Sequence, residues 1–501
     1  MPSDTQPETL YSKRTPIFPR RVKGNFRRMK WWLMGMMLGI YYVTPWLRWD
    51  RGPSMPDQAV LLDLAHRRFF FFMIEIWPHE FYFVAGLLIM AGLGLFLFTA
   101  ALGRVWCGYA CPQTVWTDLF ILVERWIEGD RNARVRLHHQ PWNAEKIRKY
   151  GLKWTVWLLI GLATGGAWVF YFTDAPTLAR DLVTGQAHPV AYTTMAILTL
   201  TTFLFGGFFR EQICIYACPW PRIQAAMMDE DTITIGYRDW RGEPRGKLKK
   251  DFVLPAGKTM PKGSVAFAPD TAPGGAPAAD KPKGDCIDCM ACVNVCPMGI
   301  DIRNGQQLAC ITCGLCIDAC NDVMDKVGKP RGLVGYLALT DEVAERGGAK
   351  PISVWRHIFR LRTMVYTVLW AGVGVVLVVA LFLRSEIEVN VTPVRNPTYV
   401  TLSDGSVRNT YDLRLLNKHG DDRQFRISLT SDEVLRIALE GTDDLRVTVP
   451  ANESRMQRVY VVARPGSAAA EGERTSLRLW VEDMGSTDRV HHDTIFNGKG
   501  K

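Results

Sequence analysis

Long apolar runs separated by charged segments are the main pattern in the first 385 residues of the chain. A helix needs about 20 apolar residues to cross a hydrocarbon layer of about 30 Å. Five stretches meet this requirement, although the first is short and is interrupted by Pro45. The pattern therefore predicts a multi-domain membrane protein with an α-helical transmembrane bundle of five spans. The spans are expected at residues 31–47, 82–103, 154–173, 191–209 and 364–383.

Basic residues gather in the segments beside these runs and give much of the formal charge of +10. An ionised side chain at the centre of a membrane helix costs about 2.5 to 3.5 kcal/mol, and Lys and Arg accumulate in cytoplasmic loops. The N-terminus and the connections after the second and fourth spans should therefore be cytoplasmic, and five spans place the C-terminus on the other side. The basic residues of the first two segments include Arg20, Arg21, Lys23, Arg27, Arg28, Lys30, Arg131, Arg134, Arg136, Arg148, Lys149 and Lys153.

The pattern changes to strand-like alternation from Glu386 to about Phe496. About six or seven short alternating runs, such as "EIEVNVTP", "QFRISL" and "SLRLWVED", are separated by Asp, Gly, Asn and Pro. Such a series predicts an antiparallel β-sandwich. Before it, residues 254–284 are dominated by Pro, Gly and Ala, which is typical of a flexible linker.

Two cysteine ladders carry the strongest chemical signal. The segment "CIDCMACVNVCP" follows the C-x2-C-x2-C-x3-C-P pattern, and "CITCGLCIDAC" repeats the spacing. A 4Fe-4S cluster needs four thiolates, and in the bacterial two-cluster arrangement the fourth comes from the other ladder. The sequence therefore predicts a bacterial-type ferredoxin segment with two 4Fe-4S clusters. One would be held by Cys286, Cys289, Cys292 and Cys320, and the other by Cys310, Cys313, Cys316 and Cys296.

Structural zinc is the alternative for these ladders, but zinc sites with four cysteines usually consist of two separated C-x2-C pairs. Pro297 follows the first ladder as expected, whereas Asn321 stands in the corresponding place after the second. We interpret this difference as a loop variation.

A second kind of cysteine motif, C-x3-C-P, occurs twice, just after the second and fourth predicted spans. "WCGYACP" contains Cys107 and Cys111, and "ICIYACP" contains Cys214 and Cys218. If the spans form a bundle, the four thiols converge near one membrane face. Soft thiolates suit Cu(I), zinc or iron-sulfur iron, and a dithiol can also exchange electrons. Burial as small apolar residues is the alternative.

Other cofactors and partners find less support in the sequence. Haem between membrane helices needs axial ligands such as histidine pairs, and no histidine is central in a predicted span. No Gly-rich nucleotide fingerprint stands out, so we expect neither haem nor flavin nor NAD. The basic residues lie beside apolar runs rather than along one stripe, which favours contact with membrane lipid over nucleic acid.

Together the two C-x3-C-P motifs, the double ladder, the fifth span and the segment "NPTYVTLSDGSVRNTYDLRLLNK" resemble the CcoG/FixG/RdxA family of cytochrome cbb(3) oxidase accessory proteins. The resemblance covers nearly the whole chain. It implies a bacterial inner membrane location, a cytoplasmic ferredoxin segment and a periplasmic immunoglobulin-like C-terminal domain. It also implies a cupric reductase role in copper supply to the oxidase. Cys107, Cys111, Cys214 and Cys218 match the family's membrane-edge cysteines, and we expect them to form the copper or thiol redox site.

The expected domain order follows from these patterns. It comprises a basic cytoplasmic N-terminus (1–30), a four-helix membrane region (31–210), a cytoplasmic connection with linker (211–284), a ferredoxin segment (285–330), a second connection (331–363), the fifth transmembrane helix (364–384) and the sandwich (385–501).

Two alternative functions share most of these features. The first is a quinol-oxidising membrane ferredoxin that conducts electrons, although proteins of that type lack the fifth span and the sandwich. The second is a non-enzymatic assembly scaffold. The expected partners are a cytoplasmic electron donor and a copper chaperone or oxidase assembly factors; the sequence does not indicate the oligomeric state.

Overall fold

The computed structural model describes residues 16–53, 55–247, 284–350, 353–384, 387–442, 444–486 and 488–500. Most of the predicted linker at 254–284 lies outside these residues. The chain forms two compact units. One contains Met1–Leu47, Val60–Phe70 and Glu75–Val375, and the other contains Arg48–Ala59, Phe71–Ile74 and Val376–Lys501.

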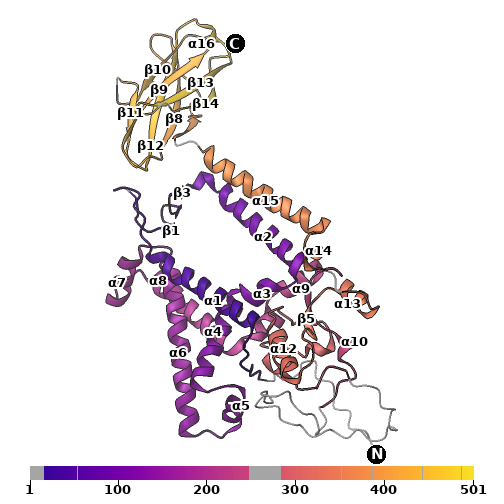
Figure 1. Ribbon diagram of the computed structural model, residues 1–501. Helices are drawn as coiled ribbons and strands as arrows, with labels where there is room; N and C mark the ends of the chain where they lie inside the picture. The colour runs from indigo at the N-terminus through magenta and orange to yellow at the C-terminus, as the bar shows by residue number, and fades with distance from the viewer. Residues whose placement is uncertain are drawn as a thin grey trace, which may run out of the picture. The chain divides into compact units, whose positions relative to one another are not determined.

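Helices dominate the first unit (Figure 1). They begin with α1 (Asn25–Val43), η1 (Thr44–Trp46), η2 (Pro78–Glu80), α2 (Tyr82–Leu102), α3 (Val105–Tyr109), α4 (Pro112–Ile127), α5 (Arg131–His139), α6 (Ala144–Val169), α7 (Ala175–Thr184) and α8 (Pro189–Thr202). The π-helices η3 (Phe203–Phe209) and η4 (Ile213–Ala217) follow, and then α9 (Trp220–Met227) and α10 (Asp239–Gly242). A small sheet has the order β1 (Val60–Asp63), β2 (Arg68–Phe71) and β3 (Ile74–Ile76).

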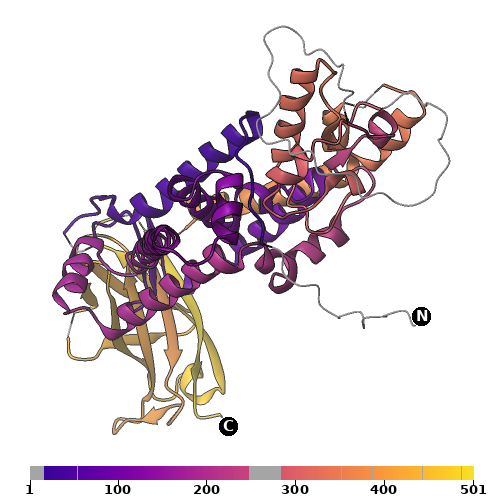
Figure 2. The same ribbon diagram turned by 90° about the horizontal axis from the view of Figure 1, so that it is seen from below.

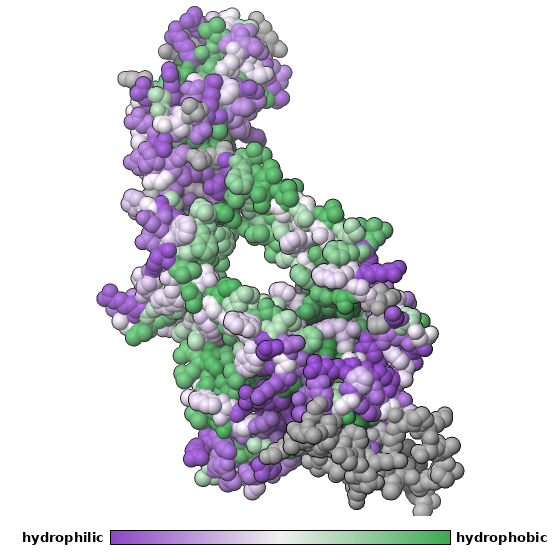
Figure 3. Space-filling model, viewed as in Figure 1, coloured by the Kyte–Doolittle hydropathy of each residue, from purple (hydrophilic) through white to green (hydrophobic). Residues whose placement is uncertain are grey.

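Four helical segments among the described residues are long and apolar enough to cross a membrane. They are Pro78–Leu102, Ala144–Val169, Pro189–Phe209 and α15 (Leu361–Phe382). Figure 3 shows hydrophobic side chains covering α15, as expected of a helix that faces lipid. These segments coincide with four of the five predicted spans. The remaining span, 31–47, corresponds to α1, which starts earlier and includes Arg27, Arg28 and Lys30 in its first two turns.

Small residues allow α6 and α8 to pack closely. A Cβ atom at Gly161 would lie 2.9 Å from the carbonyl oxygen of Thr199, and one at Gly165 would lie 2.6 Å from that of Met195. Both distances are too short for any side chain. Two small residues four positions apart form such contacts between membrane helices because they let the backbones approach.

We therefore expect Gly165→Leu to destabilise the bundle by about 1 to 3 kcal/mol, because the larger side chain must push α8 away. Gly166→Leu is the matched control, since its nearest neighbour, the Met195 sulfur, lies at 4.0 Å. The measurement is the midpoint of thermal unfolding of the purified protein in detergent. Equal midpoints for the two variants would contradict the packing described here.

The helix α4 is amphipathic and was not predicted from the sequence. Its apolar side buries Phe120, whose ring stacks on Trp157 of α6 with centroids 5.2 Å apart. Its polar side carries Glu124, which pairs with both Arg134 and Arg210. Arg134 and Lys153, predicted as basic residues of a cytoplasmic connection, are thus buried in an ion-pair network with Glu124 and Glu128.

The cysteine ladders fold as a lobe of the same unit. Its elements are α11 (Ala291–Val295), η5 (Ile302–Asn304), α12 (Leu315–Val327), α13 (Leu339–Arg346) and α14 (Val354–Ile358). A two-stranded antiparallel sheet pairs β4 (Thr234–Tyr237) with β5 (Val334–Leu337). This sheet joins segments that precede and follow the ladders, so it closes the lobe. The lobe is fastened to α1 by Asp318 of α12, which accepts a hydrogen bond from Arg27 N at 2.9 Å.

The second unit contains an antiparallel β-sandwich, which confirms that prediction. One sheet has the order β10–β12–β8–β6 with β7 paired to β8, and the other has the order β11–β9–β13–β14. The strands are β6 (Ile387–Pro393), β7 (Val400–Thr401), β8 (Val407–Asn417), β9 (Arg423–Ser431), β10 (Leu435–Leu439), β11 (Arg446–Val449), β12 (Ser454–Ala463), β13 (Arg474–Asp483) and β14 (Arg489–Asn497). Tyr411, Phe425 and Phe496 are fully buried between the sheets.

Candidate functional site

The two cysteine ladders follow the same backbone path. In each ladder the third cysteine lies in a helix, Cys292 in α11 and Cys316 in α12. Just before each helix stands a residue in the left-handed region, Met290 with φ 57° and Gly314 with φ 73°. The repeated spacing in the sequence is therefore a repeated fold.

A second left-handed residue recurs between the first two cysteines of each ladder. Asp288 and Thr312 both have φ 53°. Alternation of right- and left-handed residues turns successive backbone N–H groups toward one side, which creates a concave site for an anion or an iron-sulfur cluster. The N–H of Thr312 accordingly donates to the sulfur of Cys310 at 3.5 Å.

The eight ladder thiols gather in two groups of four, and each group mixes the ladders. In the first group, burial raises the pKa of Cys320 to about 12, and the nearby thiols of Cys289 and Cys286 add to the shift. Burial also raises the pKa of Cys292, and among the thiols Cys320 contributes most to this shift. The last cysteine of the second ladder thus lies with the first three cysteines of the first ladder.

The second group has the reciprocal composition. Burial raises the pKa of Cys296 to about 12, with further contributions from Cys313 and Cys310. Burial raises the pKa of Cys316 well above its usual value, and the thiols of Cys313, Cys310, Cys296 and Cys292 add to the shift. The effect of Cys292 on Cys316 places the two groups side by side.

These groups fit 4Fe-4S clusters. Each offers four thiols in a largely apolar pocket, with Ile287, Ile302, Ile311 and Leu315 buried around them. A cluster takes its ligands at four separate irons, so its thiols stand wider apart than the ligands of a single ion. Among the described residues, no group of three or more His, Cys, Asp or Glu is arranged to hold a single metal ion.

The interpretation of Asn321 as a loop variation is wrong. Asn321 lies inside α12, which continues to Val327, and its side chain accepts a hydrogen bond from Gly332 N at 3.0 Å. A proline inside a helix would break it, so the position after Cys320 must be another residue. Cys296, by contrast, ends α11, and Pro297 is tolerated there.

The two C-x3-C-P motifs adopt similar conformations. Cys107 lies in α3 and Cys214 in η4, so the first cysteine of each motif is in a short helical turn. Cys111 and Cys218 precede prolines, which favour an extended residue before them. Both are extended, with ψ 128° and 125°. Cys111 is the N-cap residue of α4, and Cys218 lies two residues before α9.

The four membrane-edge thiols lie near one another, as expected if the spans that precede the two C-x3-C-P motifs pack as a bundle. Burial raises the pKa of Cys214 to about 12, and the thiols of Cys111, Cys107 and Cys218 contribute to the shift. The sulfur of Cys107 also lies 3.1 Å from Oε1 of Gln224, which belongs to α9 beyond the second motif. All four side chains are half-buried.

The first membrane-edge motif lies directly against the second ladder. A Cβ atom at Gly108 would lie 2.5 Å from the carbonyl oxygen of Ile311 and 3.1 Å from Cα of Cys313. The hydroxyl of Tyr109 donates to the carbonyl oxygen of Cys313 at 2.9 Å. Only glycine permits this approach, so backbone contact joins α3 to the loop that carries Cys310 and Cys313.

Sequence reasoning missed Gly108, Tyr109 and Gln224, although the first two lie inside a motif that it singled out. A glycine between two candidate metal ligands indicates a close backbone approach, and this was the available signal. Gln224 carries no such signal, because its role depends on how α9 packs against α2 and α3.

Comparison with protein-family models gives matches over three parts of the chain. Residues 377–499 match a model described as the IG-like fold at the C-terminus of FixG, whose description names a candidate oxidoreductase. Residues 209–262 and 274–338 match a 4Fe-4S dicluster domain. Residues 83–130 match a 4Fe-4S binding domain, and this range includes Cys107 and Cys111.

Three curated proteins are similar over almost their whole length. Protein RdxB of Cereibacter sphaeroides is 72% identical over 497 residues, which are 99% of each chain. Protein RdxA of the same organism is 63% identical over 481 residues, which are 96% of each chain. Nitrogen fixation protein FixG of Rhizobium meliloti is 51% identical over 520 aligned residues, covering 98% of this chain and 94% of FixG.

Proposed function

This chain belongs to the FixG/RdxA family of iron-sulfur proteins, and we propose that it is a membrane-bound cupric reductase that serves the assembly of a cbb(3)-type cytochrome oxidase. In this proposal Cys286, Cys289, Cys292 and Cys320 hold one 4Fe-4S cluster, and Cys310, Cys313, Cys316 and Cys296 hold the other. Such clusters supply one-electron transfer when bound. The substrate Cu(II) takes up one electron and leaves as Cu(I).

The contact between α3 and the second ladder is the observation that carries the proposal. It makes the group of Cys310, Cys313, Cys316 and Cys296 the nearer one to the membrane-edge thiols, through Gly108 and Tyr109. The group with Cys286 would therefore receive electrons first, from a cytoplasmic donor, and the nearer group would pass them on.

The surroundings of Cys214 support copper as the substrate. Cys214 lines a cavity of about 20 Å³ together with Met298, Asp118 and Glu211. A thiol and a thioether are soft ligands that suit Cu(I). Two cations, Lys30 and Arg210, line the same cavity and balance the two carboxylates, so the thiol and the thioether are the features that favour copper. The four membrane-edge cysteines would hold the copper that is reduced.

The contacts of α1 support the first predicted span, 31–47, as a fifth membrane crossing, and hence the proposed topology. Its first turn meets Asp318 of the cluster lobe, whereas near its end the Tyr41 hydroxyl donates to the Thr164 carbonyl at 2.7 Å and the Tyr171 hydroxyl donates to the Tyr41 carbonyl at 2.9 Å. Thr164 and Tyr171 lie near the end of α6. Figure 2 shows α1 in indigo as one continuous helix. We therefore place the ferredoxin segment in the cytoplasm and the sandwich in the periplasm, across the inner membrane.

The test is to reduce the purified full-length protein with dithionite, remove the excess and add Cu(II) anaerobically. We expect the cluster absorbance to return as Cu(II) oxidises the clusters, with one Cu(I) trapped by a chelating dye for each electron lost. Clusters that stay reduced in the presence of Cu(II) would overturn the cupric reductase proposal.

The two alternative functions predict different results in the same preparation. A quinol-oxidising conduit requires that added quinol reduces the oxidised clusters. An assembly scaffold requires that the clusters exchange electrons with neither quinol nor Cu(II). The sandwich would then dock a copper chaperone or another oxidase assembly factor.

A further inference from the structure

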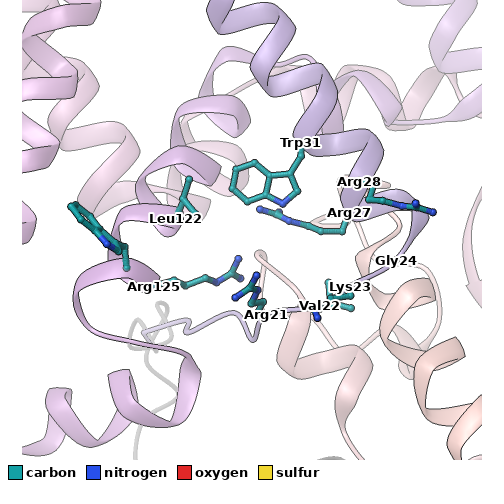
Figure 4. A pocket seen from close by; sticks show the side chains of 10 residues that line it. Arg21, Val22, Lys23, Gly24, Arg27, Arg28, Trp31, Leu122 and Arg125 are labelled. Atoms are coloured by element: carbon teal, nitrogen blue, oxygen red, sulfur yellow. The ribbon is translucent and has the colours of Figure 1, made fainter.

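A basic pocket of about 900 Å³ lies between the start of α1 and the end of α4 (Figure 4). It is separate from the cysteines, and no part of the proposed copper chemistry uses it. The pocket has five cationic side chains in its wall and no carboxylate. Its lining residues are Arg21, Val22, Lys23, Gly24, Arg27, Arg28, Trp31, Leu122, Arg125 and Trp126.

Two of the cations, the buried Arg27 and the half-buried Arg125, each have a buried nitrogen atom without a hydrogen-bond partner among the described residues. Arg27 is only 5% exposed; its Nη1 pairs with both oxygens of Asp118 at 2.9 Å, but its Nη2 has no partner in the part of the chain that the structure describes. The Nε of Arg125 likewise has none there, although its Nη2 donates to two backbone carbonyls. Both nitrogen atoms have almost no exposed surface, so the two guanidinium groups act on a ligand in the pocket through their charge rather than by direct hydrogen bonds.

Positive charge in the pocket exceeds what the neighbouring carboxylates neutralise. Burial and the nearby charge of Arg27 lower the pKa of Arg125 to about 10, and Asp118 and Asp130 offset only part of this. The backbone N–H groups at the start of α1 are already used, because Asp318 accepts from Phe26 N and Arg27 N. The side chains, rather than the helix terminus, would therefore bind an anion.

The rim of the pocket is apolar and faces outward. Trp126 is 77% exposed and Leu122 is 37% exposed. The Arg27 guanidinium lies over the Trp31 ring, 4.3 Å from its centroid. Exposed tryptophan is typical of the level of lipid headgroups. A ligand with a negative head and an apolar body satisfies both parts of the pocket.

We propose that this pocket binds the phosphate group of an acidic phospholipid. The exposed Lys23 and Arg28 side chains would contact the phosphate, the buried charges of Arg27 and Arg125 would attract it from behind, and the acyl chains would pass Leu122 and Trp126. Basic pockets beside membrane helices bind acidic headgroups in this way. The bound lipid bridges α1 and α4, the two helices that hold the cluster lobe and the first C-x3-C-P motif. The site thus fixes the lobe at the bilayer surface.

The test compares lipid binding by the full-length protein and two variants of equal charge. Lys23→Gln/Arg28→Gln changes exposed residues of the pocket, and Arg136→Gln/Arg148→Gln changes exposed residues outside it. Each protein is purified, placed in nanodiscs of phosphatidylcholine containing some phosphatidylglycerol, and analysed by native mass spectrometry. We expect the wild type and the outside variant to retain phosphatidylglycerol, and the pocket variant to retain about tenfold less.

Two further arms identify the ligand. Nanodiscs of phosphatidylcholine alone should leave the pocket without retained lipid, and excess inorganic phosphate should not displace phosphatidylglycerol. Displacement by phosphate would assign the pocket to a soluble anion and overturn the lipid proposal. Equal retention by the pocket and outside variants would overturn it as well. Both readouts are independent of copper reduction, so they do not depend on the proposed function.

Discussion

Replacement of Cys107, Cys111, Cys214 and Cys218 together by serine is expected to lower the rate of Cu(II) reduction by about 100-fold or more, since losing a group that merely supports a metal ligand already costs about 10- to 100-fold. Both 4Fe-4S clusters should remain. The reason is that the ligands proposed for the two clusters are the eight ladder cysteines, and none of them is changed in this variant. The measurement is Cu(I) formation by the holoprotein after dithionite reduction.

Iron content is the control that distinguishes a copper site at these four cysteines from a third 4Fe-4S cluster. The family model matching residues 83–130 is described as a 4Fe-4S binding domain, and the only cysteines in that range are Cys107 and Cys111. A further cluster would need all four membrane-edge cysteines, so wild type would contain about twelve irons rather than about eight. A loss of about four irons in the quadruple variant would therefore assign these thiols to a cluster and not to copper.

Two double variants test whether both C-x3-C-P motifs are needed for copper reduction. Because the four thiols converge, Cys107→Ser/Cys111→Ser and Cys214→Ser/Cys218→Ser should each reduce the rate nearly as much as the quadruple change. Unchanged turnover in either pair would show that copper is held by the other pair alone. Unchanged turnover in the quadruple variant would remove all four from the mechanism.

The sequence predicted the elements that depend on local pattern. The ladder spacing and the strand alternation each predicted a local element, because a period of two or a fixed spacing reflects a local backbone geometry. About six or seven strands were predicted after Glu386, whereas the sandwich has nine, β6 to β14. Strand β14 carries Arg489, His491 and Asp493 on one face, so the usual alternation of apolar and polar residues is weak there.

The contacts that build the site could not be read from the same patterns. Arg27 and Lys30 were interpreted only as topology determinants, yet both are buried, since Asp118 on α4 lies beside them. Their partner is about 90 positions away in the sequence, and nothing in a local window marks it. Likewise, Met290 and Asp288 accept a left-handed backbone that usually favours glycine, because the cluster loop requires it.

The second large effect concerns how the two ladders share their cysteines. Cys320→Ser should cost the protein one cluster, and iron should fall from about eight to about four atoms per chain. Cys289→Ser should give the same loss, because Cys289 lies in the same group of thiols as Cys320. If both cysteines hold one cluster, then the double variant Cys320→Ser/Cys289→Ser loses no more iron than either single variant.

The matched comparison is Cys320→Ser/Cys313→Ser, in which the second change falls in the other group. We expect this double variant to lose both clusters and nearly all its iron, with no paramagnetic signal after reduction. Two independent cluster sites predict that iron losses add when the two changed cysteines belong to different groups, and do not add when they belong to the same group. The opposite outcome, full loss with Cys289 and half loss with Cys313, would mean that each ladder holds its own cluster, and the order of electron transfer proposed from the α3 contact would then have to be redrawn.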